Sequence, residues 1–491
     1  METVTHSGLQ NRIDGDFVTK THLTDRKEKI LILGGGLTGL SAGYVLSKTG
    51  LSVTVFEHDQ KVGGISKTIE HDGFRFDIGP HRFFTKDPRL EAFVKDLMGD
   101  ELITVPRKTK IFIRGKYFDY PLEPVNAVFG MGLITTLKIL GDYGLERIKR
   151  LFREPDLISL EDWVVANFGR TLFDIYFKEY SEKVWGIPCS AISAEWVARR
   201  IKGLSLSSAV ANAFFKIKGR EIPSLVDEFL YPRLGIGRLS DKLAEGIERS
   251  GAVYTNLGVE RISRTGYTVD SITVRDRDGS RIYGGAIFIS SIPITKLITM
   301  LDPPPPAEIL AAASSLKFRD LVTVTLMIDR PRVTDLTWIY IPEKNIPIGR
   351  LHEPTNWSTE MAPEGKTLLV AEFFSFQGDA VWNSSDDDLT RTAVESLERL
   401  GYIKGREVLE SVVLRVPQAY PLFEIGYEKH LDVMYDYVAQ FTNLHIAGRA
   451  GQFKYYNMDH AIDSGMKTAD KIMRQSTVSI LRSGPAANMS R

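Results

Sequence analysis

The 491-residue sequence contains a single cysteine, Cys189, which excludes an intramolecular disulfide and any cysteine-based metal cluster. Net charge is absent as well, because 62 basic residues balance 62 acidic ones, and nothing indicates a nucleic-acid partner. A long hydrophobic run is also missing: residues 125–140 form the most apolar stretch, but polar and glycine positions interrupt it and it is too short for a transmembrane helix. These features favour a globular, cytoplasmic enzyme that needs no metal.

A glycine-rich fingerprint follows the first predicted strand, Lys29–Leu33. The strand leads directly into Gly-x-Gly-x-x-Gly and then into a helix that should end near Lys48, which is the context that a dinucleotide site requires. Such glycines allow a tight turn, a close approach of the backbone to a pyrophosphate, and packing of the helix on the sheet. The residues predicted to line the cofactor here are Gly34, Gly36, Leu37, Thr38 and Gly39.

A second predicted strand, residues 52–57, ends in Glu57 at the distance expected for a carboxylate that binds a ribose hydroxyl. This residue favours FAD or NAD over a ligand with a 2′-phosphate. The next segment contains Gly63, Gly64, Ile65 and Ser66, and it resembles the second glycine pair of FAD proteins of the glutathione-reductase-like class. The pair favours FAD over NAD, and a plain surface turn is the alternative.

Later segments resemble further parts of the same class. Residues 252–260 resemble the strand whose backbone, at Val259, contacts the adenine, and residues 286–293 resemble the strand that returns to the sheet. Residues 443–447 should form a last strand, followed by a helix from Asp459 whose N-terminal dipole would face the flavin ring. The cofactor-binding residues implied in this region are Gly448, Arg449, Asn457 and Met458.

Two segments outside the cofactor site resemble the UDP-galactopyranose mutases. Residues 79–85 resemble a Gly-Pro-His loop that borders the flavin N5 in that family, although Phe84 replaces a second histidine. Residues 177–186 resemble the Phe-x-x-Tyr-Thr-x-Lys-x-Trp-Gly block, in which an aromatic pair three residues apart should share a helix face. The alternatives are a hydrogen-bonded loop histidine at His81 and a purely structural role for the aromatic residues.

Three further segments carry the same resemblance. Residues 349–354 resemble the segment whose arginine grips the diphosphate, while 416–421 and 448–460 resemble the segments with phosphate-binding tyrosines. Two adjacent arginines stand where the family has an arginine on a mobile loop, and a solvated surface pair is the alternative. The resemblance thus assigns catalysis to His81, Arg350, Tyr420 and Tyr455, and substrate binding to Phe177, Tyr180, Trp185, Arg199, Arg200 and Asn457.

The resemblance implies a mutase that interconverts the pyranose and furanose forms of a nucleotide-diphosphate sugar, with reduced FAD as the nucleophile, no net redox change, and NAD(P)H as a reductant. The differences at Phe84 and Asn457 leave the sugar and the base open, and a homo-oligomer stays open too. One alternative is an FAD-dependent oxidoreductase of the protoporphyrinogen oxidase, amine oxidase or carotenoid desaturase type. Another is a non-catalytic binding protein similar to the Rab GDP-dissociation inhibitors.

The length of the chain predicts several domains, and the patterns above predict an α/β protein with a Rossmann-like FAD-binding domain of the glutathione-reductase-like class. Helical periodicity and strand alternation predict an inserted helical domain and an antiparallel-sheet substrate domain. The predicted parts are flexible tails at 1–28 and 476–491, an FAD-binding domain at 29–88, 224–300 and 441–475, a helical substrate domain at 121–223, and a sheet-rich substrate domain at 100–120 and 301–440.

Overall fold

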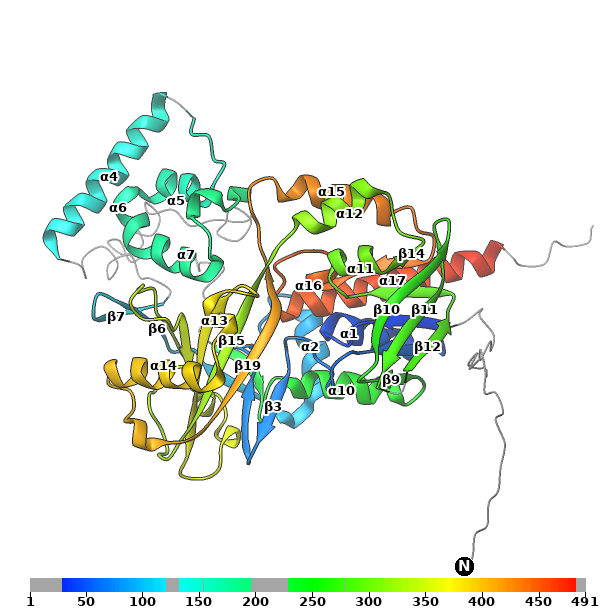
Figure 1. The fold of residues 1–491 in the computed structure, drawn as a ribbon, viewed down its shortest axis with the longest axis horizontal. Coiled ribbons are helices and arrows are strands. Elements are labelled where there is room, and N and C mark those ends of the chain that lie inside the picture. Colours follow the sequence, from blue (N-terminus) through cyan, green and yellow to red (C-terminus); the bar gives the residue numbers. More distant parts are fainter. Residues whose placement is uncertain (1–28, 121–131, 153, 196–227, 278, 483–491) are drawn as a thin grey trace, which may run out of the picture.

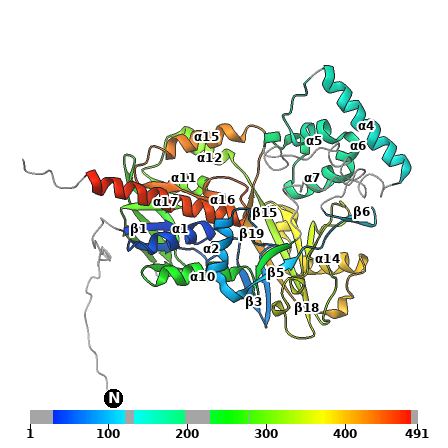
Figure 2. The ribbon, with the colours of Figure 1, turned by 180° about the vertical axis from the view of Figure 1, so that it is seen from behind.

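A computed structural model describes residues 29–120, 132–152, 154–195, 228–277 and 279–482, with the backbone alone from 476 onward (Figure 1). The predicted N-terminal tail and the arginine pair Arg199 and Arg200 lie outside these residues. Figures 1 and 2 show a layered α/β part at one end of the molecule, with a large sheet and a helical part side by side at the other. Within the described residues, no helix has the length and apolarity that crossing a membrane requires.

A five-stranded parallel sheet forms the centre of the layered part, in the order β20-β13-β1-β2-β9. β1 is an almost uninterrupted apolar run because the sheet is covered on both faces. Ile30 and Ile32 point to one core, and Leu31 and Leu33 point to the other. The strands are β1 (Lys29–Leu33), β2 (Ser52–Phe56), β9 (Ala252–Tyr254), β13 (Ile287–Ser290) and β20 (Leu444–Ile446).

Helices cover one face of this sheet, and a second sheet covers the other. The helical layer consists of α1 (Leu37–Ser47), α2 (Pro88–Met98), α10 (Gly237–Glu248) and α17 (Met458–Arg482), whose apolar residues pack with Ile30 and Ile32. The opposite layer is a four-stranded sheet in the order β12-β11-β10-β14. Its strands are β10 (Gly258–Thr265), β11 (Thr268–Asp276), β12 (Gly279–Gly284) and β14 (Leu301–Asp302). Beside it pack α11 (Ile294–Met300), α12 (Ala307–Ser315) and α15 (Tyr427–Val438).

The large sheet has seven strands in the order β19-β15-β18-β17-β16-β6-β7. Its strands are β6 (Thr109–Ile113), β7 (Lys116–Asp119), β15 (Phe318–Ile328), β16 (Trp338–Tyr340), β17 (Arg350–His352), β18 (Thr367–Ser375) and β19 (Val408–Pro421). The helix α14 (Asp386–Arg399) contributes Leu389, Ala393 and Leu397 to the core on one face, and α13 (Ala380–Asn383) precedes it. Two small antiparallel pairs lie between the two parts: the hairpin of β3 (Thr68–His71) with β4 (Phe74–Asp77), and the long-range pair of β5 (Leu102–Pro106) with β8 (Glu228–Pro232).

The helical part contains α4 (Leu133–Phe152), α5 (Leu160–Phe168), α6 (Arg170–Leu172), the π-helix η3 (Phe173–Lys178) and α7 (Glu179–Trp185). α5 begins at a capping box, in which Ser159 and Asp162 exchange side-chain and backbone hydrogen bonds. The helical pattern of residues 158–185 is broken at Gly169, whose φ is +88°. The remaining short segments are η2 (Gly99–Glu101), η4 (Cys189–Ala191), η5 (Pro354–Asn356), η6 (Thr359–Met361), η7 (Gly405–Glu407) and α16 (Gly448–Gly451).

Several predicted boundaries are corrected by these elements. Residues 252–260 are two strands in different sheets rather than one, because the chain turns at Asn256, where φ is +56°. The large sheet is mixed, not purely antiparallel, since β6 and β16 run parallel. β5 joins β8 instead of the large sheet, β14 joins the four-stranded sheet, and α17 continues beyond residue 475, where a tail was predicted.

Candidate functional site

The glycine fingerprint forms a turn suited to a pyrophosphate. Gly34 has a φ of +103°, which only glycine adopts readily, and Gly36 is the N-cap of the helix α1 and provides no side-chain hydrogen bond. Gly36 also faces the second glycine pair: a Cβ on Gly64 would lie 3.3 Å from the Gly36 Cα. The uncapped helix N-terminus and this close backbone approach fit a phosphate-bearing cofactor.

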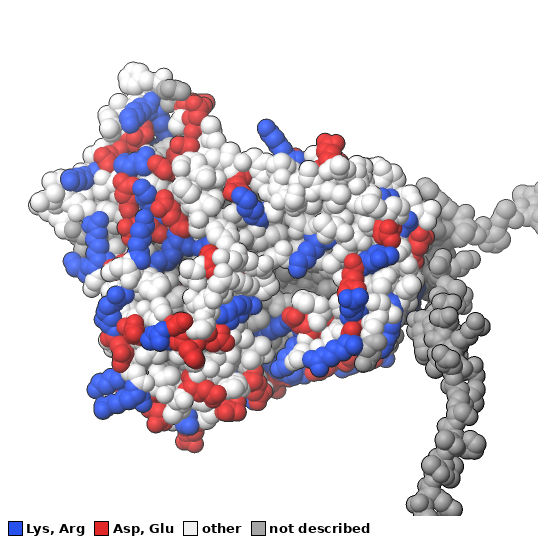
Figure 3. Space-filling view, viewed as in Figure 1, with Lys and Arg blue, Asp and Glu red and all other residues white. Residues whose placement is uncertain are grey.

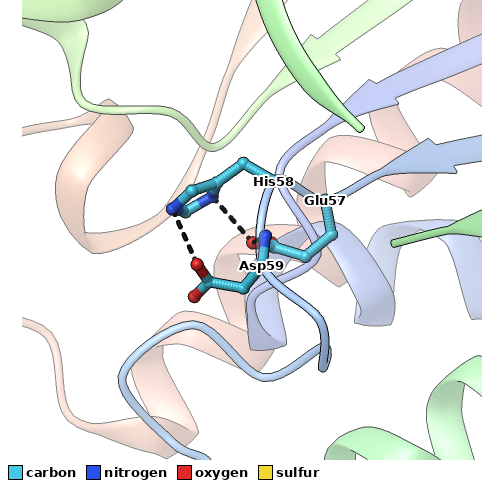
Figure 4. Close-up of side chains that lie close together, drawn as sticks. All are labelled: Glu57, His58 and Asp59. Atoms are coloured by element: carbon cyan, nitrogen blue, oxygen red, sulfur yellow. Dashed lines mark hydrogen bonds and ion pairs between the residues drawn. The ribbon is translucent and has the colours of Figure 1, made fainter. Parts of the chain in front are cut away.

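Glu57 lies next to this turn and directly follows β2, which ends one residue earlier than predicted. Its Oε2 accepts a hydrogen bond from the Gly35 N–H at 2.8 Å, and its Oε1 accepts one from the Asp59 N–H at 3.0 Å. Burial alone would raise the pKa of Glu57, but these bonds and His58 hold the pKa below its usual value. Figure 4 shows His58 between the two carboxylates, with its Nδ1 2.8 Å from Glu57 Oε1 and its Nε2 3.1 Å from Asp59 Oδ1. An ionised Glu57 is the form that accepts hydrogen bonds from ribose hydroxyls.

An open cavity of about 380 Å³ lies next to Glu57. His58, Gly258 and Val259 line it together with Arg275 and Arg277. Val259 therefore lines the cavity next to Glu57, the carboxylate that the sequence predicts to bind the ribose, and the resemblance expects an adenine contact at Val259. Of the other residues in the second glycine segment, Ser66 is buried and Ile65 is half-buried.

The C-terminal cofactor segment packs against α1. A Cβ on Gly448 would lie 2.4 Å from the Thr38 Oγ1, and Thr38 donates a hydrogen bond to the Ala461 carbonyl at 2.9 Å. Met458, the first residue of α17, is buried, whereas Asn457 is exposed. The structure thus brings the N-termini of α1 and α17 to one region, with Leu37 buried between them and the core.

Three of the four predicted catalytic residues come together from β17, β19 and the loop between α16 and α17. Arg350 on β17 donates a hydrogen bond to the Tyr420 hydroxyl on β19 at 3.0 Å. The ring of Tyr420 stacks on that of Tyr455, with centroids 6.0 Å apart and an interplanar angle of 18°. Arg449 covers both rings, at 5.1 Å and 4.5 Å from the two centroids. The cluster therefore combines two guanidinium groups with two phenols.

The charge of Arg350 is already balanced by Glu372, a residue that the sequence reasoning missed. Its guanidinium donates from Nε to Glu372 Oε1 at 2.8 Å and from a terminal nitrogen to Oε2. Glu372 is fully buried on β18, directly opposite Arg350 in the strand register. Burial raises the pKa of Glu372, and Arg350 opposes that rise. A charged residue inside the apolar run of β18 was the available sequence signal.

Two histidines lie near this ion pair. Burial and the charges of Arg449 and Arg350 lower the pKa of His81 to about 3, so its ring is neutral at physiological pH. Its Nδ1 is buried without a hydrogen-bond partner among the described residues. His352 is also buried and stacks on Trp357, and burial holds its pKa well below the usual value. The cluster is therefore cationic only through its arginines.

The aromatic block of residues 177–185 separates into two groups. Phe177 lies in the π-helix and stacks on Phe168, 5.8 Å away, so it packs in the core, as the structural alternative held. Tyr180 instead meets Tyr340 of β16 edge-on at 5.3 Å. Trp185 is buried behind the phenols, 6.3 Å from Tyr420 and 6.2 Å from Tyr455. The wider π turn explains why two residues three apart do not share one face.

Lys183, in the same block, ties the helical part to the large sheet. Its ammonium group donates to four backbone carbonyls of the β16–β17 connection, those of Ile341, Glu343, Ile346 and Ile348, at 2.7 to 3.2 Å. Burial lowers the pKa of Lys183 to about 8. Arg319 supports the same junction by donating to the Val184 carbonyl at 3.0 Å. These bonds position Tyr180 and Trp185 against β16 and β19.

The chain belongs to a family described as flavin containing amine oxidoreductases, whose model matches residues 37–473. It is 20% identical over 486 residues to coproporphyrinogen III oxidase of Staphylococcus aureus (strain NCTC 8325 / PS 47), with 91% of this chain and 99% of that protein covered. It is 24% identical over 439 residues to chloroplastic protoporphyrinogen oxidase 1 of Spinacia oleracea, with coverages of 82% and 76%. Among solved structures, reduced UDP-galactopyranose mutase is similar, with a TM-score of 0.79, 21% identity, and 92% and 94% of the two chains covered.

These similarities confirm the expected α/β flavin-binding fold and the broader superfamily. Family membership implies FAD, and the uncapped α1 N-terminus, the apposed glycines and the ionised Glu57 fit that cofactor. The sequence relatives are named as oxidases, whereas the structural neighbour is named as a mutase. The protein is therefore a flavoenzyme by family.

Proposed function

We propose that the protein is a nucleotide-diphosphate sugar mutase that works with reduced FAD and interconverts the ring forms of the sugar. The observation that carries this proposal is the convergence of Arg350, Arg449, Tyr420 and Tyr455 in one cluster. Guanidinium and phenol groups are hydrogen-bond donors suited to phosphate oxygens. The similarity of the fold to that of UDP-galactopyranose mutase also supports a mutase function.

The phenols of the cluster would serve as neutral donors. Burial raises the pKa of Tyr420, while the charge of Arg350 opposes this effect, so the hydroxyl keeps its proton at neutral pH. Tyr455, stacked on it, shares the guanidinium of Arg449. The two phenols and Arg449 would hold the diphosphate and stabilise the negative charge that develops as it leaves the sugar.

The surrounding residues would orient the sugar and exclude water. Trp185 and Phe423 close the buried side of the phenol pair. Tyr180 and Tyr340 offer aromatic edges at the helical side, where a nucleobase could stack. Reduced FAD, when bound, supplies an electron-rich nitrogen as the nucleophile for the anomeric carbon. NAD(P)H is the proposed source of the priming electrons.

A ligand titration of the oxidised, FAD-loaded protein tests the proposed substrate class. UDP-glucose and coproporphyrin III are added separately, and the flavin absorbance and the heat of binding are followed. Saturable binding of the nucleotide sugar, with no binding of the porphyrin, is the expected result. Binding of the porphyrin alone would overturn the proposal.

The second candidate is an oxidoreductase similar to the porphyrinogen oxidases. Two observations favour it: the relatives that cover most of the chain carry that name, and Glu372 already neutralises Arg350. This candidate predicts oxygen uptake with a porphyrinogen substrate, which an oxygen electrode measures. The non-catalytic alternative predicts a colourless protein that FAD does not reconstitute, and family membership speaks against it.

A further inference from the structure

Arg82 is a cationic residue near the candidate site, and it is not among the residues assigned to catalysis, cofactor binding or substrate binding. It lies in the loop between His81 and Phe83, and Phe83 forms an isolated bridge with Leu230 of β8. The Arg82 guanidinium lies 4.5 Å from the Trp338 ring centroid and 5.9 Å from that of Phe229. Among the described residues, no carboxylate and no carbonyl pairs with it. Arg350 and Arg449, by contrast, are engaged by Glu372 and by two backbone carbonyls.

The surroundings of Arg82 favour an anionic ligand. Burial is the main cause of the lowered pKa of Arg82, and the neighbouring charges of Arg107 and Arg350 add to that effect. The indole Nε1 of Trp338, the residue on which Arg82 stacks, is itself buried without a hydrogen-bond partner among the described residues. Arg82 is half-buried and has no counter-ion among the described residues, which is unfavourable for a partly desolvated cation, and an anionic group of a ligand would stabilise it.

Arg82 lies among different aromatic residues from those that Arg449 covers. Its charge interacts with the phenols of Tyr340 and Tyr120, whose rings lie 4.9 Å apart at the edge of the large sheet. Arg449 covers Tyr420 and Tyr455 instead. If Arg449, Tyr420 and Tyr455 hold the diphosphate, Arg82 is available for another part of the same substrate.

We infer that Arg82 binds a carboxylate on the sugar, so that the substrate is a nucleotide-diphosphate hexuronic acid. This inference rests on the proposed function and narrows its substrate class. A guanidinium suits the two oxygens of a carboxylate, and the aromatic face of Trp338 fixes its plane. Arg82 is then a specificity-determining residue, and the phenol pair with Arg449 serves any nucleotide-diphosphate sugar.

The test compares UDP-glucuronate with UDP-glucose on the FAD-loaded protein by isothermal titration calorimetry. The wild type should bind UDP-glucuronate roughly ten- to a hundredfold more tightly, as expected for one charge-assisted hydrogen-bonded pair. Arg82→Met keeps the stem that packs on Trp338 and should abolish this preference without weakening UDP-glucose. Arg82→Lys keeps the charge without the planar fork and should retain part of the preference. Arg89→Met, at an exposed arginine on α2, is the matched control and should bind as the wild type does.

Each outcome separates the inference from the proposed function. Equal wild-type affinity for the two sugars, or an equal loss of both in Arg82→Met, overturns the carboxylate assignment while nucleotide-sugar binding stands. Failure of the wild type to bind either sugar overturns the proposed function and the inference with it. A preference that survives in Arg82→Met also rejects the inference, because another residue must then read the carboxylate.

Discussion

The substitution Glu372→Gln separates two roles of the Arg350 ion pair. In the native protein, Glu372 is fully buried and accepts two hydrogen bonds from Arg350, whose side chain is 15% exposed. Removing the negative charge leaves a buried guanidinium without its counter-ion, which typically costs about 3–5 kcal/mol. Because glutamine keeps one acceptor oxygen, we expect a loss near the lower end, about 3 kcal/mol in the free energy of unfolding.

The same substitution should strengthen the binding of an anion. Glu372 repels any phosphate near Arg350, and two unit charges about 8 Å apart interact by about 2 kcal/mol at an effective dielectric constant of about 20. Screening reduces this value, so removing the repulsion should tighten UDP binding roughly tenfold. Stability and affinity would therefore change in opposite directions.

Urea unfolding followed by circular dichroism, and calorimetric titration with UDP, measure the two effects on the FAD-loaded protein. Glu410→Gln is the matched control, since Glu410 is about half exposed and pairs with His71 on the surface; it should change stability by about 0.5 kcal/mol or less. The reasoning is refuted if Glu372→Gln unfolds as the wild type does and binds UDP with unchanged affinity.

Three further substitutions test other parts of the structure. Glu57→Gln removes the ionised acceptor that is proposed to bind the ribose and should weaken FAD binding roughly tenfold or more, measured by the fluorescence of released flavin. Full retention of FAD would contradict this role. His81 has a pKa of about 3 in the folded protein, so as the pH falls the unfolded chain binds this proton first, and the free energy of unfolding decreases by up to about 1.4 kcal/mol per pH unit below pH 6.5. His81→Gln should flatten this dependence between pH 6 and 4 in Tm measurements. An unchanged slope would argue against a buried neutral ring. Lys183→Met removes four hydrogen bonds to the β16–β17 connection and should speed proteolysis within residues 154–195. Lys149→Met, at an exposed lysine, is the control and should not change the cleavage rate. Equal cleavage of the two variants would show that Lys183 does not position this segment.

The dinucleotide turn could be predicted because its signals are local. A buried strand, three glycines and a helix follow one another within about twenty residues, and the backbone conformation at Gly34 is one that glycine readily adopts. Glu57 could be predicted for the same reason, since its place is fixed by the end of β2. The convergence of Arg350, Tyr420 and Tyr455 was a prediction from resemblance, and the structure brings the three side chains together.

The features that could not be predicted from the sequence depend on contacts between distant segments of the chain or on helix geometry. Glu372 meets Arg350 only through the register of β17 with β18, which the sequence does not specify. The parallel pairing of β6 with β16 joins segments more than two hundred residues apart. Phe177 was misplaced because spacing was judged on an α-helix, whereas the chain forms a π turn at Phe173–Lys178. That Arg82 has no charged partner within the described part of the chain could be recognised only once its neighbours were known.

The distribution of surface charge adds little to the specificity of the site. Figure 3 shows acidic and basic side chains intermixed over the visible face, in keeping with the balanced composition. Long-range steering of an anionic substrate is therefore not expected to dominate. The arginines and phenols within the site would provide the recognition.

An anaerobic assay with the fully reduced, FAD-loaded protein is the most direct test of chemistry without net redox change. UDP-glucuronate and UDP-galactose are incubated with it, the sugar products are separated by chromatography, and the flavin spectrum is recorded throughout. Repeated formation of an isomer of the same mass, with the flavin still reduced at the end and no reaction by the oxidised protein, is the predicted result. Turnover by the oxidised protein, with electrons passing from the substrate to the flavin, would contradict the mutase account.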